Sequence, residues 1–340
     1  MNNQQFSQTD RQSWIDELKG LAIFFVVLGH MPYTSDTVII KHMIYSFHMP
    51  LFFLLAGCTA AISASRNSDS VFLKNRVISL FIPYIIWCLI HGTLFTNSIL
   101  ELSNYQIQSH WEALIYGKVN NWFLICLFTL ILLFYIYQIT TKKLNSIGKG
   151  AIVTTLFILI FALHKLFGKT SDADFNSFEF LTSAYVYFIP FTFGIILIKY
   201  ERVKNLILKN NILIFFCVII SLIAPGLLST INIGSNYPKI VTGLCVSCVL
   251  IRLAQTGALN IPYFNNARSF FAYIGKHSLG IYLMSSIMLP NSSLPLGSGL
   301  EAFVIYGLYS AIVCVLCILL EKLICTSNVL ALLLFGKRTK

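Results

Sequence analysis

The feature that most constrains this chain is a series of apolar runs, each close to the length of a membrane-spanning helix. A helix needs about 20 predominantly apolar residues to cross the hydrocarbon core of a bilayer, and such runs recur from Leu18 to Leu320. Only 11% of the residues are charged and the mean hydropathy is +0.76, whereas soluble domains carry about 25% charged residues. These few charges could not cover the surface of a soluble globule. The sequence therefore predicts an all-α integral membrane protein.

A window of that length marks ten apolar segments, so we expect a bundle of about ten transmembrane helices. One such domain accounts for residues 1–340, with a polar N-terminal segment (1–17) and a short basic tail (336–340). A further apolar stretch, Val329–Phe335, is too short to span and is expected at the membrane interface. The ten segments are Leu18–Tyr33, Met43–Ser63, Val77–Leu94, Val119–Ile139, Gly150–Leu166, Glu179–Ile198, Asn211–Leu228, Tyr237–Gln255, Arg268–Leu289 and Leu300–Leu320.

The distribution of Lys and Arg predicts the orientation of this bundle. If the N-terminus is cytoplasmic, 19 of the 24 Lys and Arg lie on the cytoplasmic side, in alternate connecting segments and in the tail. Such an asymmetry is what the positive-inside rule describes, so we expect both termini in the cytoplasm and a multi-pass protein of the cell inner membrane. The same asymmetry accounts for most of the formal charge of +11 without a nucleic-acid partner.

The first apolar segment carries two ionisable residues, Lys19 and His30, with ten residues between them. Eleven steps of about 100° return to nearly the same helix face, roughly 16 Å further along the axis. Ionisable groups within a membrane are costly and therefore suggest function. A phosphate-bearing substrate entering from the cytoplasm would meet Lys19 first and reach toward His30. The alternative is a Lys that snorkels to the interface and a His that bonds within the bundle.

A second histidine, His48, follows in the next apolar segment within the run Phe47–Phe53. Because this helix runs opposite to the first, the two imidazoles should lie at comparable depth. Pro50 removes a backbone donor and bends the helix, which favours a cavity nearby.

The pattern of these residues resembles that of the acyltransferase-3 family of integral membrane acyltransferases. The sequence around Lys19 and His30 is most similar to the family's fucose 4-O-acetylase-like branch. A basic residue, ten residues and a histidine, followed by Phe-His-Met-Pro-Leu-Phe-Phe, carry the resemblance. Further similar motifs follow in order along nearly the whole chain: Arg76 with Pro83-Tyr84, Asn121-Trp122-Phe123-Leu124, and Ser278-Leu279-Gly280-Ile281-Tyr282-Leu283.

The chain also departs from the family pattern. Many members have a histidine where Ser285 stands, and the basic position that is Lys19 here is often arginine, whose fork binds phosphate in a bidentate way. The hydrolase-like domain of some longer members is absent from this sequence.

The resemblance implies transfer of an acyl group, usually acetyl from acetyl-CoA, to a hydroxyl of a cell-surface carbohydrate such as O-antigen, capsule or exopolysaccharide. His30 would act as general base or as a covalent acyl relay. His48 would orient His30 or donate to the developing oxyanion. Lys19 and Arg76 would hold the CoA phosphates, and four residues would bind substrate or line the cavity: Asp16, which could instead face solvent, Tyr84, Trp122 and Tyr282.

The expected partners are acyl-CoA, a glycan or lipid-linked sugar and membrane lipid, with no permanently bound cofactor and no metal site. The pairs Cys245/Cys248 and Cys314/Cys317 have metal-ligand spacing, but lie in apolar runs and are interpreted as packing residues. Two alternatives stay open. A transporter would use buried histidines for protons or substrate, and a non-catalytic subunit of a polysaccharide assembly system would need neither histidine.

Overall fold

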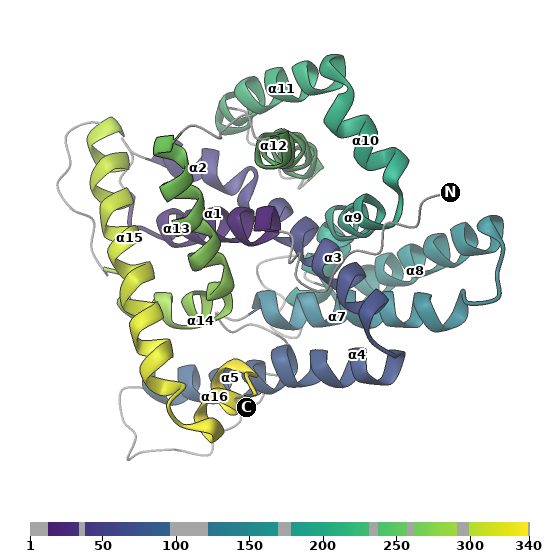
Figure 1. Cartoon of the computed structure of the whole chain (residues 1–340), viewed down its shortest axis with the longest axis horizontal. Helices are drawn as coiled ribbons and strands as arrows, with labels where there is room; N and C mark the ends of the chain where they lie inside the picture. Colours follow the sequence, from purple (N-terminus) through teal and green to yellow (C-terminus); the bar gives the residue numbers. More distant parts are fainter. Residues whose placement is uncertain are drawn as a thin grey trace. The chain divides into compact units, whose positions relative to one another are not determined.

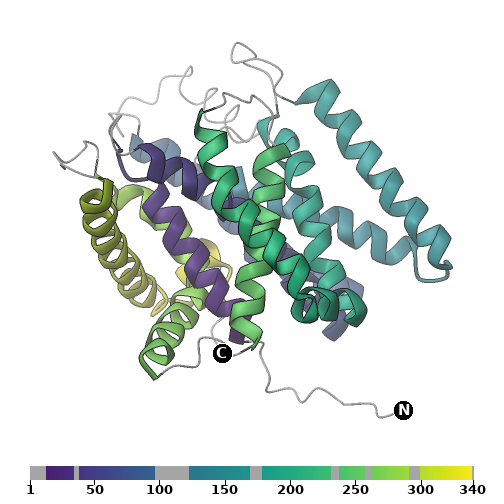
Figure 2. The same cartoon turned by 90° about the horizontal axis from the view of Figure 1, so that it is seen from above.

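A computed structural model describes residues 13–33, 38–95, 122–168, 178–230, 237–256, 262–290 and 299–338. Helices are the regular elements in these ranges, and no strand occurs among them (Figures 1 and 2). The predicted all-α class is therefore confirmed for the described residues. Residues 96–121 and 169–177, which connect predicted segments, lie outside the described ranges.

Each of the ten predicted segments has a helical counterpart. Seven helices of the described residues are long and apolar enough to cross a membrane, or eight if the bent pair of α10 (Glu201–Lys209) and α11 (Asn211–Thr230) is one span. The helix α1 (Ser13–Gly29) has 17 residues, so it falls below that length, and the count of ten stays a prediction. The seven are Ile40–Arg66, Asp69–Ile90, Trp122–Thr140, Ser146–Phe167, Glu179–Lys199, Pro238–Thr256 and Gly299–Ile324.

Some helices differ from the predicted segments. The ninth segment is two helices, α13 (Pro262–Lys276) and α14 (Ser278–Met288), because the helix breaks at His277. Two segments taken as connections are helical, α4 (Asp69–Arg76) and α10 (Glu201–Lys209). The helix α1 begins at Ser13, within the predicted polar segment 1–17, whose extent stays a prediction.

The contacts divide the chain into two compact units, which we describe separately. Unit 1 comprises Met1–Leu55 and Ile196–Leu319. Within it α1 packs on α13, and also contacts α2, α12 (Tyr237–Thr256) and α14, while α12 packs on α11 (Asn211–Thr230). The helix α2 (Val38–Tyr45) is separated from α3 (His48–Arg66) by a two-residue break at Ser46 and Phe47.

Unit 2 comprises Ala56–Ile195 and Leu320–Lys340. Its first rod is formed by α4, a π-helical segment η1 (Val77–Phe81) and α5 (Ile82–Phe95), which follow one another without a break. The rod packs on α7 (Trp122–Thr140) and on the C-terminal helix α16 (Asn328–Phe335). The other helices are α8 (Ser146–Phe167), α9 (Glu179–Lys199) and α15 (Gly299–Ile324), the last two with residues in both units.

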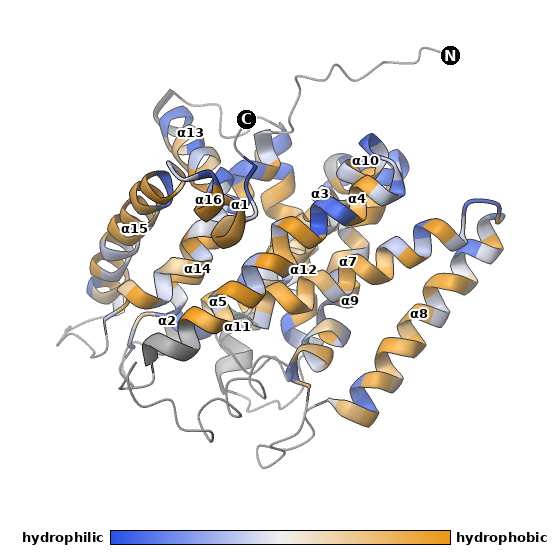
Figure 3. Ribbon diagram, turned by 90° about the horizontal axis from the view of Figure 1, so that it is seen from below, coloured by the Kyte–Doolittle hydropathy of each residue, from blue (hydrophilic) through white to orange (hydrophobic). Residues whose placement is uncertain are grey.

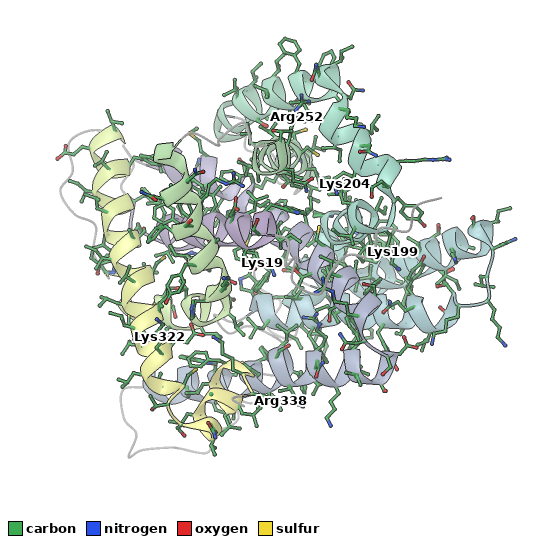
Figure 4. The ribbon with its side chains drawn as sticks, viewed as in Figure 1. Lys19, Lys199, Lys204, Arg252, Lys322 and Arg338 are labelled. Carbon is green, nitrogen blue, oxygen red and sulfur yellow. The ribbon has the colours of Figure 1, made fainter. Side chains whose placement is uncertain are left out.

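Polar residues mark the ends of these helices, whereas α15 is apolar along most of its length (Figure 3). Asn145 caps α8 by accepting a hydrogen bond of 2.9 Å from the N–H of Gly148. Basic side chains labelled in Figure 4 lie near helix ends: Lys199 at the end of α9, Lys322 near the end of α15 and Arg338 after α16. The orientation of the helices in a membrane stays a prediction.

Candidate functional site

The N-terminal half of α1 is the charged end of the candidate site. Lys19, labelled in Figure 4, is half-buried, and Asp16 is buried at 6% exposure. The alternative in which Asp16 faces solvent is therefore wrong. Glu17 forms an ion pair with Arg268 of α13, whose Nε and Nη2 donate to the two carboxylate oxygens at 2.9 and 3.3 Å. This bidentate pairing is the strong form of such an interaction.

Two glycines bring α1 and α13 into backbone contact at this end. A Cβ added to Gly20 would lie 1.8 Å from the carbonyl oxygen of Phe271, and one added to Gly275 would lie 1.8 Å from that of Asp16. Small residues allow helix backbones in membrane proteins to approach closely. The helix that carries Lys19 is therefore held against α13 by a contact that only glycine permits and by an ion pair.

His30 directly follows the last residue of α1 and is exposed. Its Nδ1 lies 2.7 Å from the carbonyl oxygen of Val26, one helical turn earlier. A carbonyl can only accept, so the Nδ1–H donates and the neutral imidazole carries its lone pair on Nε2. The helix end thus sets the tautomer that a general base or nucleophile needs.

His48 is the first residue of α3 and is buried at 1% exposure. Its Nδ1 lies 2.7 Å from the carbonyl oxygen of Ile44, which again leaves Nε2 as the basic nitrogen. The break at Ser46 and Phe47 separates the two helices here, and Pro50 follows in the first turn of α3, where a missing N–H costs little. A Cβ added to Gly243 of α12 would lie 2.5 Å from the ring of Pro50, so α12 packs closely on this turn.

The ring of Tyr45 contacts both histidines. Its centroid lies 6.1 Å from that of His30 and 4.9 Å from that of His48, the latter in an edge-to-face arrangement. Gly29 makes room for it, because an added Cβ would lie 3.1 Å from the tyrosine ring. The ammonium group of Lys41 lies 5.6 Å from the centre of the same ring. The structure therefore brings His30 and His48 together around a tyrosine.

The turn after His30 is fixed by α15. The hydroxyl of the buried Tyr306 donates to the carbonyl oxygen of Pro32 at 3.0 Å, and its ring lies 5.2 Å from that of Tyr33. The Tyr33 hydroxyl donates in turn to the carbonyl oxygen of Leu28 at 2.9 Å. These bonds hold the backbone on both sides of His30.

Unit 2 contains Arg76, the last residue of α4. Its guanidinium lies 5.3 Å from the centre of the Phe72 ring, and its Nε is buried without a hydrogen-bond partner among the described residues. A buried, unsatisfied donor of a charged group is costly. The Nε of Arg76 is therefore a buried donor for which the described residues offer no acceptor.

The remaining predicted residues lie in both units. In unit 2, Tyr84 is buried at 2% exposure and stacks on Phe81 with centroids 6.5 Å apart. Trp122 begins α7 and stacks on Tyr187 of α9, with centroids 6.2 Å apart. Tyr282 is half-buried on α14, which packs on α1 in unit 1. In the described part of the chain, no group of three or more His, Cys, Asp or Glu could hold a metal ion.

Sequence reasoning missed Tyr45, Arg268 and Tyr306. Tyr45 precedes His48 by three residues, which is close to one helical turn and was the available signal. Arg268 and Tyr306 act on residues more than two hundred positions away, so no local pattern could have identified them.

The chain was compared with known families and proteins. The model of a family described as "Acyltransferase domain" matches residues 12–322. Among curated proteins, the chain is similar to nodulation protein NolL of Sinorhizobium fredii, with 26% identity over 200 residues, 49% of this chain and 52% of the relative. It is also similar to nodulation protein NolL of Mesorhizobium japonicum, with 27% identity over 127 residues, 30% of this chain and 32% of the relative. The chain thus spans about half, or less, of the length of these relatives. No solved structure matches it.

Proposed function

Since this chain belongs to the acyltransferase-3 family, we propose that it transfers an acyl group, acetyl in the first instance, from acyl-CoA to a hydroxyl of a cell-surface carbohydrate. The acceptor is a glycan or a lipid-linked sugar of O-antigen, capsule or exopolysaccharide. The motifs around Lys19 and His30, with the wording of the fucose 4-O-acetylase-like branch, favour acetyl as the group transferred.

The observation that carries the proposal is the state of His30. Its Nδ1–H is bound to Val26, so Nε2 is unprotonated in the neutral ring, and the side chain is exposed. As general base, Nε2 takes the proton of the acceptor hydroxyl while the oxygen attacks the thioester carbonyl. The C–S bond then breaks, and the imidazolium returns the proton to the CoA thiolate. General-base catalysis is worth about 10²–10⁴-fold in rate.

The covalent alternative uses the same nitrogen. Nε2 attacks the thioester, CoA leaves as the thiolate, and the acyl group passes from the imidazole to the acceptor hydroxyl, whose proton the released ring takes up. In both versions the ring of Tyr45 contacts the two imidazoles. His48 has its Nδ1 engaged with Ile44, so when its ring is protonated the group left to donate to a developing oxyanion is Nε2–H.

Positively charged side chains bind the acyl donor, acyl-CoA. Lys19 on α1 and Arg76 on the rod of unit 2 bind the phosphates of acyl-CoA. The buried Nε–H of Arg76 is a hydrogen-bond donor without a partner among the described residues. Asp16, Tyr84, Trp122 and Tyr282 bind substrate or line its path. In this proposal the donor enters from the cytoplasm, both termini are cytoplasmic, about ten helices span the cell inner membrane, and lipid surrounds them.

The test compares two histidine variants of the full-length protein in cells. His30→Asn should lower acetylation of the surface polysaccharide by about 100-fold or more, measured by mass spectrometry of the purified glycan. His42→Asn, on the exposed side of α2, should leave it unchanged. Export of the polysaccharide should be normal in both strains, because a transporter would lose export instead.

Normal acetylation by a folded His30→Asn protein, verified by size-exclusion chromatography, would overturn the proposal. The two mechanisms are separated with purified protein and radiolabelled acetyl-CoA without acceptor. Label retained on the protein indicates the covalent relay, whereas release of CoA only after acceptor is added indicates the general base.

A further inference from the structure

The C-terminal helix α16 ends on the π-helical segment η1, in a contact between two backbones. Gly336, which ends α16, has φ of 61°, in the left-handed region that favours glycine. A Cβ added there would lie 2.3 Å from the carbonyl oxygen of Ile78 and 2.4 Å from the Cα of Ser79. Both the backbone angle and the space therefore require glycine at this position.

Three further interactions hold α16 in this place. The indole Nε1 of Trp87 on α5 donates to the carbonyl oxygen of Leu334 at 2.9 Å. Phe335 is buried, with its ring 6.5 Å from that of Trp87. The ammonium of Lys337 pairs with the carboxylate of Glu321, which is only 1% exposed. The apolar stretch predicted at the membrane interface thus docks on α5 and η1 (Figure 1), while Val329 and Leu330 stay exposed.

The π-helical segment determines where Arg76 points. Arg76 is the last residue before η1, and the N–H of Ile82 bonds the carbonyl oxygen of Val77 five residues back. A π turn adds one residue to an α-helix, so it rotates the residues on one side by about 100° relative to those on the other. Such turns are rare and common at functional sites. Without the extra residue of the π turn, the direction of the Arg76 side chain relative to Tyr84 and Trp87 would differ by about 100° from the one observed.

We propose that α16 is a positioning element for Arg76: Gly336, seated on Ile78 and Ser79, holds η1 in its π-helical form and so directs the guanidinium at the phosphates of acyl-CoA. This inference rests on the proposed function, in which Arg76 binds the donor. Gly336 touches no substrate and acts only through Arg76. In this proposal acyl-CoA engages the guanidinium of Arg76, whose buried Nε has no partner among the described residues.

The experiment measures acetyl-CoA binding to the purified full-length protein and the KM and kcat of acetyl transfer. Gly336→Ala should raise the Kd and KM for acetyl-CoA by about tenfold, with kcat changed less than threefold. Trp87→Phe keeps an aromatic side chain but loses the indole N–H that bonds Leu334, and it should raise the same constants by about threefold. Gly307→Ala is the matched control, because no atom lies within 4 Å of its added Cβ, and it should bind as the parent does.

A double-mutant comparison separates positioning from a general loss of stability. In an Arg76→Ala background, Gly336→Ala and Trp87→Phe should cause no further loss of acetyl-CoA affinity, because the group they position is gone. A loss that adds fully to that of Arg76→Ala would overturn the inference. So would unchanged binding by the folded Gly336→Ala protein or, if that protein does not fold, by Trp87→Phe.

The control Arg76→Ala separates this inference from the proposed function. If Arg76→Ala binds acetyl-CoA as tightly as the parent, the proposed donor site is wrong, and the inference falls with it. If Arg76→Ala weakens binding and neither Gly336→Ala nor Trp87→Phe does, the site for acyl-CoA stands and only the role of α16 is overturned.

Discussion

At two helix crossings in this protein, glycine allows the backbones of two helices to touch, but the surroundings of the two crossings differ. In unit 1, α1 crosses α13 through Gly20 and Gly275, with added Cβ atoms 1.8 Å from opposing carbonyl oxygens. In unit 2, to which α3 belongs from Ala56 onward, α3 crosses α9 through Gly57, where the corresponding distance to the carbonyl oxygen of Phe191 is 2.0 Å. Both contacts depend on the absence of a side chain.

The polar interactions around the crossings differ. The crossing of α1 and α13 includes the bidentate pair of Glu17 and Arg268, and the same helix carries Lys19 and ends at His30. At the crossing of α3 and α9, the thiol of Cys58 donates to the carbonyl oxygen of Gly194 at 3.3 Å. Buried charges are expensive and need their partners, so we interpret the first crossing as part of the site and the second as packing alone.

The largest expected effect comes from adding a methyl group at each crossing. Gly20→Ala and Gly57→Ala should both lower the free energy of unfolding by about 1–3 kcal/mol or more, because the helices must move apart. At a temperature where both proteins are folded, Gly20→Ala should lose more than tenfold in acetyl transfer and Gly57→Ala less than twofold. Size-exclusion chromatography after heating and an acetyl-CoA turnover assay measure the two quantities.

Gly150→Ala serves as control for these glycine variants, since no atom lies within 4 Å of its added Cβ. Equal losses of activity in Gly20→Ala and Gly57→Ala would contradict the distinction between the two crossings.

A smaller effect is expected from the ion pair. Glu17 and Arg268 are only 12% and 22% exposed, so a double-mutant cycle with Glu17→Gln and Arg268→Gln should give a coupling energy of about 1–3 kcal/mol. The pair of Asp69 and Lys142 is 29% and 60% exposed, and the cycle of Asp69→Asn and Lys142→Gln should give less than about 1 kcal/mol. Thermal unfolding of the single and double variants gives both coupling energies. Coupling energies of equal size would show that burial does not strengthen the pair of Glu17 and Arg268.

The smallest effect is expected from the thiol at the apolar crossing. Cys58→Ala removes one weak hydrogen bond and one atom from a buried position, so the free energy of unfolding should fall by about 1 kcal/mol. Acetyl transfer should stay within twofold of the parent, measured in the same assay. A larger loss of activity in a folded protein would show that the crossing of α3 and α9 also supports the site.

The sequence predicted most of the helices because their formation is local. A membrane-spanning helix satisfies its own backbone hydrogen bonds, and the bilayer sets its length, so apolar runs such as Trp122–Thr140 and Gly299–Ile324 were readable directly. The sequence also marked Lys19, His30 and His48 as ionisable residues within apolar runs, although His30 lies just beyond the end of α1 and their roles stay predictions.

The partners of these residues were decided only by the tertiary structure. Arg268 reaches Glu17 across 251 positions, and Gly336 docks on Ile78 across a similar distance. The ninth segment breaks at His277, although its apolar pattern continues. Helix pairing depends on which small residues pack against each other and which buried polar groups form hydrogen bonds. Neither can be predicted from the periodicity of one helix. The sequence by itself therefore determined a helical membrane acyltransferase with His30 and His48 as its candidate catalytic residues. The packing of α13, α15 and α16 decided how its charged residues and these histidines are held.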